Sequence, residues 1–337
     1  MSSVAEPRVL IAGASGFAGA IAARLVDRHP FFELGPVTSR SDAGRRLDEL
    51  YPHHRVTATL EQLDLDRLDG VEAAIVAYPH GASAPVVAAL RERGARVIDL
   101  SADFRLHDRA VYEATYVPHE APQLLPEAVY GLTELHRDAI REAGLVANPG
   151  CFPTAALLAL APLARAGLIA DVVVDAKTGV SGAGRAPSET THFVSIAENV
   201  RPYKVGAHRH TPEIDQELAV LGAPVATTFV PHLVPLDQGE LVSCYVTPPE
   251  PVGQPALDAL YATAYAAEPF VDVVSVPPGV RDVRETNYCA VHARVDPRSG
   301  KVLVFAAIDN LWKGTSSQAI QNLNLMFGRP ETEGLVG

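Results

Sequence analysis

The first 150 residues alternate short apolar runs with longer segments of helical spacing. The apolar runs predict buried strands, and they cover residues 9–12, 34–39, 73–77, 97–100 and 144–147. Helical spacing predicts helices over 18–29 and 83–93, and Gly94 suits a left-handed stop for the second. Because strands alternate with helices, we expect right-handed crossovers and a parallel, doubly wound sheet.

The pattern changes near residue 150, which predicts a second domain of different architecture. After an Ala/Leu-rich helix over 155–166, apolar or alternating segments predict strands over 171–177, 225–234, 241–246, 288–295 and 302–308. The last two flank a turn at 296–300 and predict an antiparallel hairpin. A final helix over 316–327 has Thr315 or Ser316 as its cap and Gly328 as its stop.

These patterns predict an α/β protein of two domains. We expect a parallel-sheet domain over residues 1–148, on which 314–337 packs back. We expect an α+β domain with a mixed, largely antiparallel sheet over 149–313. The chain has 337 residues, and at about 100–200 residues per domain two domains are its simplest division.

The net charge and the length of the apolar runs limit the classes of partner that we expect for this protein. The net charge of −12 argues against a binder of nucleic acid, which needs a concentrated basic face. No apolar run approaches the roughly 18 residues of a membrane helix, and the N-terminal sequence does not resemble a signal peptide. We therefore expect no membrane partner and a cytoplasmic location. The chain has only three cysteines, an odd number, which does not indicate a set of structural disulfide bonds. We therefore expect the thiols to be reduced.

The spacing G-x-x-G-x-x-G lies between the first predicted strand and the first predicted helix. Its glycines are Gly13, Gly16 and Gly19. Such glycines allow a tight turn and close approach of a pyrophosphate to the helix N-terminus. The context therefore predicts a dinucleotide site, and the alternative is a glycine turn without a ligand.

The end of the second predicted strand indicates which dinucleotide binds. An NAD site usually has Asp or Glu there, whereas this chain has Thr38, Ser39 and Arg40. Ser39 and Arg40 suit a ribose 2′-phosphate, so the sequence favours NADP(H). The alternative is that Arg40 is a solvated loop residue.

One cysteine lies in a sequence context unlike that of the other two. Cys151 follows Asn148-Pro149-Gly150 directly before the Ala/Leu-rich helix, and Pro153 suits its first turn. A helix N-terminus lowers a thiol pKa, and its N–H groups can stabilise an oxyanion. Cys244 and Cys289 lie within apolar strands and are expected to be buried packing residues.

A proton-transfer partner for Cys151 is predicted in the segment His208-Arg209-His210. Thr211 can cap a helix begun by Pro212, and one of the two histidines is then the general acid/base. Two alternatives are a solvated loop pair and a zinc site; the zinc site needs further ligands and is disfavoured, so no metal is expected. Its ligands would be the two histidines with Cys289 and His292. A nicotinamide beside a cysteine nucleophile indicates reduction of an activated acyl group, such as an acyl phosphate, through a thioester.

The chain resembles the N-acetyl-gamma-glutamyl-phosphate reductase family over nearly its whole length. The resemblance rests on motifs at residues 13–19, 38–40, 78–81, 99–106, 148–155, 181–185, 208–214 and 308–314. It implies NADPH-dependent conversion of the small-molecule acyl phosphate to N-acetylglutamate 5-semialdehyde and inorganic phosphate, in arginine biosynthesis. It also implies a Rossmann domain, an α+β domain that carries the dimer contact, and a homodimer or homotetramer.

The resemblance assigns a role to each matching residue. Cys151 forms the thioacyl intermediate, and His208 is the general acid/base, with His210 the less favoured candidate. Substrate contacts are implied for Ser101, Arg105, Asn148, Arg209, His210 and Glu213. Cofactor contacts are implied for Gly13, Ser15, Gly16, Phe17, Gly19, Ser39, Arg40, Pro79, His80, Ser181, Gly182, Gly184 and Asn310, with Lys313 completing the site. One departure is Tyr78, where an aliphatic residue is expected.

Three other functions stay open at this point. A lysine-pathway relative acts on the aminoadipyl phosphate, one methylene longer or attached to a carrier protein, and one methylene is worth only about 1–3 kcal/mol. A short-chain epimerase or reductase needs a Tyr-x-x-x-Lys pair, which neither Tyr112 nor Tyr130 provides. A non-catalytic NADP-sensing protein needs no reactive thiol.

Overall fold

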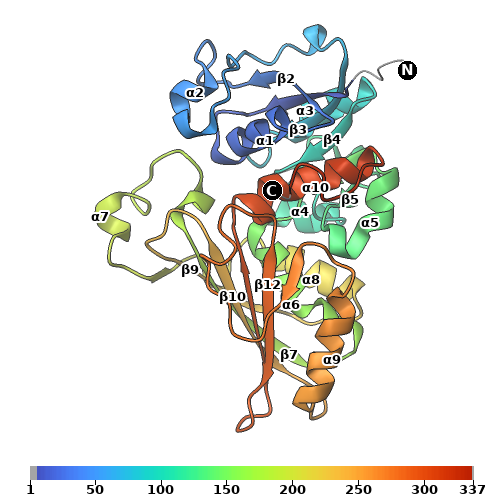
Figure 1. Ribbon diagram of the computed structural model, residues 1–337, viewed down its shortest axis with the longest axis vertical. Coiled ribbons are helices and arrows are strands. Elements are labelled where there is room, and N and C mark those ends of the chain that lie inside the picture. Colours follow the sequence, from blue (N-terminus) through green and yellow to red (C-terminus); the bar gives the residue numbers. More distant parts are fainter. Residues whose placement is uncertain (1–5, 336–337) are drawn as a thin grey trace. The chain divides into compact units, whose positions relative to one another are not determined.

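The computed structural model describes residues 6–335. The expected segments 1–148 and 314–337 therefore include residues 1–5 and 336–337, which lie outside the described residues. The chain forms two compact units: one runs to Pro149 and resumes at Thr315, and the other is Gly150–Gly314 (Figure 1).

The first unit is built on a six-stranded parallel sheet in the order β2-β1-β3-β4-β6-β5. Its strands are β1 (Arg8–Ala12), β2 (Glu33–Thr38), β3 (Val71–Val76), β4 (Arg96–Asp99), β5 (Val129–Tyr130) and β6 (Leu145–Ala147). Its helices are α1 (Phe17–Asp27), α2 (Leu47–Leu50), α3 (Ala84–Glu92), α4 (Arg109–Thr115), α5 (Thr133–Glu142) and α10 (Ser317–Met326). The doubly wound prediction is confirmed, and all five predicted strands are present within two residues of their bounds.

Both faces of this sheet are covered. Leu10 of β1 packs with Val87 and Leu90 of α3 in one apolar cluster. Successive residues of a strand point to opposite faces, so Val9 and Ile11 face the other side, and they are fully buried as well. Helices α1 and α10 pack against each other and against the sheet.

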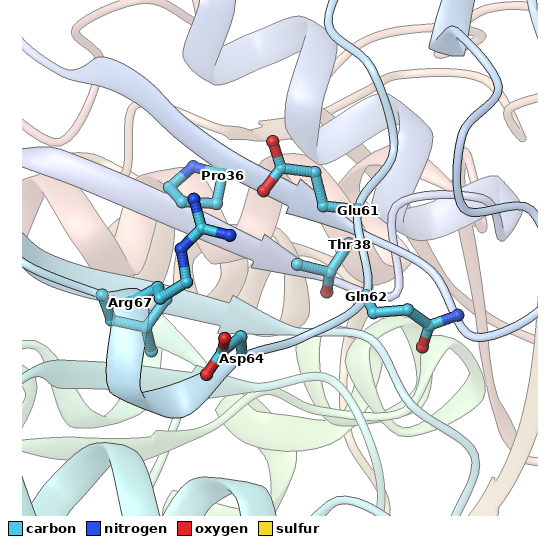
Figure 2. Close-up of a pocket in the computed structure, with 7 residues that line it drawn as sticks. Pro36, Thr38, Glu61, Gln62, Asp64 and Arg67 are labelled. Atoms are coloured by element: carbon cyan, nitrogen blue, oxygen red, sulfur yellow. The ribbon is translucent and has the colours of Figure 1, made fainter.

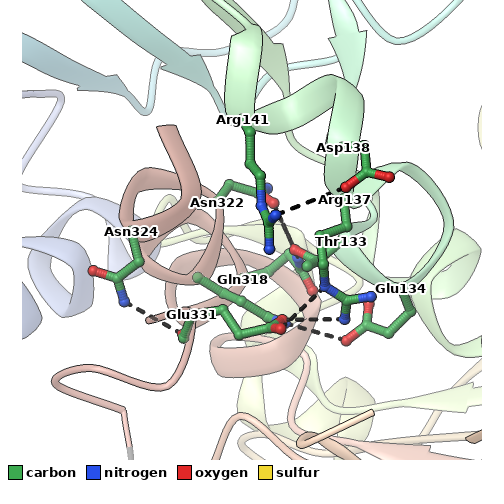
Figure 3. A network of polar contacts seen from close by, with 10 residues as sticks. Thr133, Glu134, Arg137, Asp138, Arg141, Gln318, Asn322, Asn324 and Glu331 are labelled. Carbon is green, nitrogen blue, oxygen red and sulfur yellow. Dashed lines mark hydrogen bonds and ion pairs between the residues drawn. The ribbon is translucent and has the colours of Figure 1, made fainter. Parts of the chain in front are cut away.

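Helix α10 is attached to this unit by buried amides rather than by apolar packing alone (Figure 3). The Asn322 amide donates to the Gly131 carbonyl at 2.7 Å and accepts from the Thr133 hydroxyl at 2.7 Å. Gln318 donates to the same hydroxyl at 2.8 Å. These bonds stabilise α10 because a buried amide without partners costs about 1–3 kcal/mol.

The start of α10 differs from the predicted cap. A π-helical turn, Trp312–Ser316, leads into the helix, and Ser316 takes the cap position without capping it by its side chain. Its hydroxyl donates instead to the Ala18 carbonyl at 2.9 Å. Gly328 has φ +66°, so the predicted glycine stop is confirmed.

The second unit contains a seven-stranded mixed sheet in the order β11-β12-β13-β10-β7-β9-β8. Its strands are β7 (Asp171–Thr178), β8 (Arg201–Pro202), β9 (Thr228–Leu233), β10 (Glu240–Thr247), β11 (Val271–Val273), β12 (Cys289–Val295) and β13 (Val302–Ile308). Its helices are α6 (Cys151–Arg165), α7 (Phe193–Ile196), α8 (Thr211–Val220) and α9 (Gln254–Tyr265). Four of its six strand pairings are antiparallel, including the predicted hairpin of β12 and β13.

Two predicted bounds in this unit are wrong. Helix α6 begins at Cys151, four residues before the predicted start, because Gly150 takes an extended cap conformation and Pro153 fits the first turn. Strand β9 begins at Thr228 rather than at 225. Helix α6 packs on β10, β12 and β13, so alternate residues of those strands are buried beneath it.

Short 3-10 turns complete the chain. They are η1 (Pro52–His54), η2 (Leu65–Arg67), η3 (Pro122–Leu124) and η4 (Val180–Ala183).

Candidate active site

The glycine loop of the first unit makes a tight turn between β1 and α1. Gly13 has φ +94°, and a Cβ there would lie 2.6 Å from the Ala77 carbonyl oxygen, so only glycine fits. The N–H groups of Gly13 and Ala14 donate to the Thr38 carbonyl at 3.0 and 2.8 Å, which fixes the loop on β2. Helix α1 begins at Phe17 after the extended Gly16. Its first turn offers N–H groups and the positive end of the helix dipole.

The tip of β2 lies against this loop. The Ser15 and Ser39 hydroxyls are 2.8 Å apart, and Ser39 also accepts from the Asp42 N–H at 3.1 Å. The exposed Arg40 guanidinium lies over the Tyr78 ring, 4.8 Å from its centroid. A cation over an aromatic face is stabilised by about 0.5–1 kcal/mol at exposed sites. Tyr78, the one departure from the family pattern, therefore holds the arginine predicted to contact the cofactor.

A hollow of about 320 Å³ opens beside the same strand (Figure 2). It is lined by Pro36, Thr38, Glu61, Gln62, Asp64, Arg67 and Leu68. Two carboxylates against one guanidinium make it unfavourable for a phosphate. Neither Ser39 nor Arg40 lines it, so the phosphate prediction does not depend on this hollow.

The loops that follow β3 and β4 are joined by buried carboxylates. Asp103 accepts from the N–H groups of Gly81 and Ser83, at 2.7 and 3.2 Å. Ser101 donates to Asp99 at 2.6 Å and accepts from the Asp103 N–H at 3.0 Å. Burial and the charge of Asp103 raise the pKa of Asp99 to about 6. The Ser101 hydroxyl thus already serves this network, and its substrate contact stays a prediction.

The loop that contains Pro79 and His80, two residues predicted to contact the cofactor, is also fixed by hydrogen bonds. The Pro79 carbonyl accepts from the Ala82 N–H at 3.0 Å, and His80 Nδ1 accepts from the Ala102 N–H at 2.9 Å.

Arg105 and Asn148 are joined at the end of β6. The Arg105 guanidinium is buried and donates to the carbonyls of Asn148 and Leu100 at 2.7 and 2.8 Å. The Asn148 amide donates to the Thr315 carbonyl at 3.0 Å and accepts from Asn322 at 3.2 Å. These bonds fix the backbone shortly before Cys151.

Cys151 is the first residue of α6 and is partly exposed. The N–H of Gly150, at the cap, donates to the buried Glu213 carboxylate at 2.8 Å. Glu213 therefore positions the start of α6. A Cβ on Gly314 would lie 2.8 Å from the Cys151 Cβ, so glycine is required there as well.

His208 lies among aromatic rings, one of which belongs to Phe152, the residue after Cys151. Its ring contacts those of Phe152, Phe229 and Tyr203, with centroids 5.6, 5.1 and 5.5 Å away. Its Nδ1 accepts from the His210 N–H at 3.1 Å, so Nε2 carries the proton of the neutral ring. Burial, with the charges of Lys204 and Arg209, lowers the pKa of His208 to about 4.

The predicted cap of the next helix is wrong. Helix α8 begins at Thr211, and His210 takes the cap position in a helical conformation without a side-chain cap. Arg209 lies partly buried beside His208.

The predicted glycine loop of the second unit does meet Asn310. The Asn310 amide donates to the Ser181 hydroxyl at 3.0 Å and accepts from the Gly239 N–H at 2.7 Å. Gly182 lies close to Asn310, since a Cβ there would be 3.8 Å from the Asn310 amide nitrogen. Gly184 has φ +85°. Lys313 is fully buried, 5.6 Å from the Phe270 ring centroid.

One titratable group near Cys151 was not identified from the sequence. Glu240, the first residue of β10, is fully buried. Burial raises the pKa of its carboxyl group to about 8, and the neighbouring Cys151 thiol and Thr178 hydroxyl act to lower it. The only available signal was an acidic residue at the start of an otherwise apolar strand.

The remaining thiols and the zinc alternative can be placed. Cys244 and Cys289 are buried as predicted, and burial raises the pKa of Cys244 strongly. His292 Nδ1 lies 2.9 Å from the Val274 carbonyl oxygen. Within residues 6–335, no three His, Cys, Asp or Glu side chains are grouped to hold a metal. No helix of that range is long and apolar enough to cross a membrane.

Structural comparison supports the same two-unit fold. An aspartate semialdehyde dehydrogenase II from Vibrio cholerae superposes with a TM-score of 0.73 at 20% identity, covering 96% of this chain and 98% of that one. The Candida albicans aspartate semialdehyde dehydrogenase with NADP gives 0.70 at 13% identity, covering 96% and 98%. At these identities the likeness establishes the fold alone.

Sequence comparison is more specific. Residues 8–143 match the semialdehyde dehydrogenase NAD binding domain, and residues 151–310 match the semialdehyde dehydrogenase dimerisation domain. The N-acetyl-gamma-glutamyl-phosphate reductases of Desulforudis audaxviator and Syntrophobacter fumaroxidans are 50% and 49% identical, with 98% and 97% of each chain covered. The chain therefore belongs to the N-acetyl-gamma-glutamyl-phosphate reductase family.

Proposed function

We propose that this protein reduces N-acetyl-gamma-glutamyl phosphate to N-acetylglutamate 5-semialdehyde with NADPH, releasing phosphate. The observation that carries the proposal is a partly exposed cysteine at the first position of a buried helix, in a chain half identical to such reductases. The first unit then serves as the NADP-binding domain, and Gly150–Gly314 serves as the catalytic and dimerisation domain.

Cys151 is the proposed nucleophile. Its thiolate attacks the acyl carbon, the carbon–oxygen bond to phosphate breaks, and a thioester remains on Sγ. The N–H groups of the first turn of α6 can stabilise the oxyanion formed at the carbonyl oxygen. Glu213 holds the Gly150 N–H, so it positions this turn.

His208 is the proposed general acid/base. A pKa of about 4 keeps the imidazole neutral at neutral pH, with the proton on Nε2. A neutral imidazole can donate a hydrogen bond from Nε2 to the reacting oxygen without adding a full charge to the pocket. His210, whose N–H fixes the ring, is then the positioning residue of the pair.

The residues of the first unit fit NADP(H). Gly13 and Gly19 permit the tight turn of the loop, since a Cβ on either would collide with neighbouring backbone atoms. Such a turn lets the pyrophosphate of the cofactor come close to the backbone. The contacts of Ser15 with Ser39, and of Arg40 with Tyr78, favour a 2′-phosphate at the tip of β2. The nicotinamide, when bound, supplies the hydride that reduces the thioester.

The other residue roles extend the proposal. Arg105 and Arg209 are proposed to bind the anionic ends of the substrate, as a guanidinium fork suits phosphate and carboxylate. Four further residues are proposed to contact the substrate: Ser101, Asn148, His210 and Glu213. Ser181, Gly182, Gly184 and Asn310, joined by hydrogen bonds, are proposed to contact the cofactor, together with Phe17, Pro79 and His80.

We also propose a cytoplasmic homo-oligomer, dimer or tetramer. The face of the second sheet away from α6 leaves apolar side chains half-buried, and the matching family model is described as a dimerisation domain. Those side chains are Val173, Val230, Tyr245, Leu303 and Phe305.

The test is phosphate-dependent oxidation of candidate semialdehydes with NADP. We expect turnover with the N-acetylglutamate derivative, dependent on phosphate, and much less with NAD. Preference for the N-acetyl-aminoadipate derivative would assign the chain to the lysine pathway instead. Binding of NADP without turnover of either would support a sensing protein.

A further inference from the structure

Glu240 lies in the same row of the second sheet as two other strand ends. Strand pairing places it beside Thr178 of β7 and Ile308 of β13. Its side chain is on the same face as Val242, Cys244 and Val246 by alternation. That face is the one against which α6 packs, so Glu240 points toward the helix that begins with Cys151.

The position of Cys151 agrees with this placement. Gly314 is near both the Cys151 Cβ and the Asp309 carbonyl oxygen, 2.8 and 3.3 Å from the Cβ that an alanine would have. Asp309 directly follows Ile308, the partner of Glu240 in the sheet. The thiol and the carboxyl group therefore meet at one end of β10.

The carboxyl group of Glu240 is buried beside the Cys151 thiol. Among the described residues, neither of its oxygens makes a hydrogen bond of ordinary length and angle, although both are buried. The polar groups that interact with it are the Cys151 thiol and the Thr178 hydroxyl. A buried carboxyl group without a cationic partner is stable only in its neutral form.

The charged and titratable groups around it act in the same direction. Asp309 raises the pKa of Glu240 further, and within the described part of the chain no cation acts to lower it. Tyr203 also faces the pair, since the charges of Cys151 and Glu240 both raise its pKa, which burial raises first. At pH 7 a group with a pKa of about 8 is ionised in only about one molecule in ten.

We propose that Glu240 is a second catalytic acid of this site: it stays protonated and donates a hydrogen bond to Cys151 Sγ whenever that sulfur carries negative charge. The sulfur carries this charge before it attacks the acyl group and again when it leaves the reduced adduct. The inference rests on the proposed function only in taking Sγ as the reacting atom. A neutral Glu240 lowers the pKa of the Cys151 thiol, whereas an ionised Glu240 raises it. Glu240 therefore assists thiolate formation only below about pH 8.

The test is the pH dependence of Cys151 alkylation by iodoacetamide, which needs neither substrate nor cofactor. Glu240→Met removes the donor, and we expect the midpoint of alkylation to move up by about one pH unit, a tenfold loss at pH 7. Glu240→Gln keeps an N–H donor but cannot ionise. We expect it to match the wild type near pH 7 and to react faster than the wild type above pH 8.

Three controls accompany the measurement. Cys151→Ala shows that the labelled thiol is Cys151, Thr178→Val changes the other neighbour of Glu240, and circular dichroism reports folding. Superposable profiles of the wild type and Glu240→Gln up to pH 10 would overturn the proposal, and this comparison stands even if Glu240→Met does not fold. If the alkylation pattern holds while no semialdehyde is oxidised, the proposed function fails and the acid–thiol pair remains.

Discussion

A buried neutral carboxyl group makes stability depend on pH, and Glu240→Gln isolates that dependence. In the unfolded chain the glutamate has its ordinary pKa of 4.5, whereas in the folded protein burial raises that pKa to about 8. A raised folded pKa contributes stability that is fully present below 4.5 and is lost as the pH rises through 8. Glutamine has no such ionisation, so the difference between variant and wild type isolates this group.

The magnitude follows from the two pKa values. Each pH unit between 4.5 and 8 is worth about 1.4 kcal/mol, which sets an upper limit of about 5 kcal/mol for this group. We therefore expect equal free energies of unfolding at about pH 4.5. By about pH 8 the variant should be more stable by about 3–5 kcal/mol, with no further change above that.

The assay is urea unfolding followed by fluorescence over this pH range. The chain has a single tryptophan, Trp312, which lies in the same unit as Glu240, so its emission reports the relevant transition. Glu250→Gln is the matched control, because Glu250 is exposed in the same unit and its substitution should change stability by less than about 0.5 kcal/mol. A difference between Glu240→Gln and wild type that does not vary with pH would refute the reasoning.

Three further predictions concern the remaining contacts. Asn322→Leu removes three buried hydrogen bonds and should lower the unfolding free energy of the first unit by about 2–4 kcal/mol in urea, whereas a loss below 0.5 kcal/mol would contradict the network. Arg40→Ala should raise the KM for NADPH by about tenfold or more with little effect on NADH, and Tyr78→Leu by only about two- to fivefold; equal effects on both cofactors would place the 2′-phosphate elsewhere. Gly314→Ala should displace Cys151 and lower kcat by about a hundredfold while NADPH binding, measured by fluorescence, is retained; unchanged kcat would mean that the helix start tolerates the added Cβ.

The apolar pattern was sufficient for the elements that bury whole faces. The strands of the parallel sheet and the hairpin of β12 and β13 were predicted because each is a run of apolar or alternating residues. Strand β5 has two residues, too few for any periodic signal. For α6 the apolar run alone placed the start at residue 155, whereas the cap at Gly150 and the proline at Pro153 mark the observed start at Cys151.

The site divides in the same way. The loop containing Gly13 and the context of Cys151 were readable because glycine spacing and a helix start are local signals. Glu240 was not, because its neighbours come from other strands and from α6, and only strand pairing brings them together. The neutral state of His208 likewise depends on burial among rings from separate segments. The amide side chains of α10 are polar and would be expected on the protein surface from the sequence alone. They are buried because their hydrogen-bond partners come from a distant segment of the chain.

The central claim is that Cys151 carries the acyl group. It is tested most directly by mixing the protein with N-acetyl-gamma-glutamyl phosphate in the absence of NADPH and mapping the product by peptide mass spectrometry. We predict release of phosphate with one acyl group on the Cys151 peptide, discharged as the semialdehyde when NADPH is added, and no adduct in Cys151→Ala. Reduction of the acyl phosphate by Cys151→Ala at the wild-type rate, or an adduct on another residue, would contradict it.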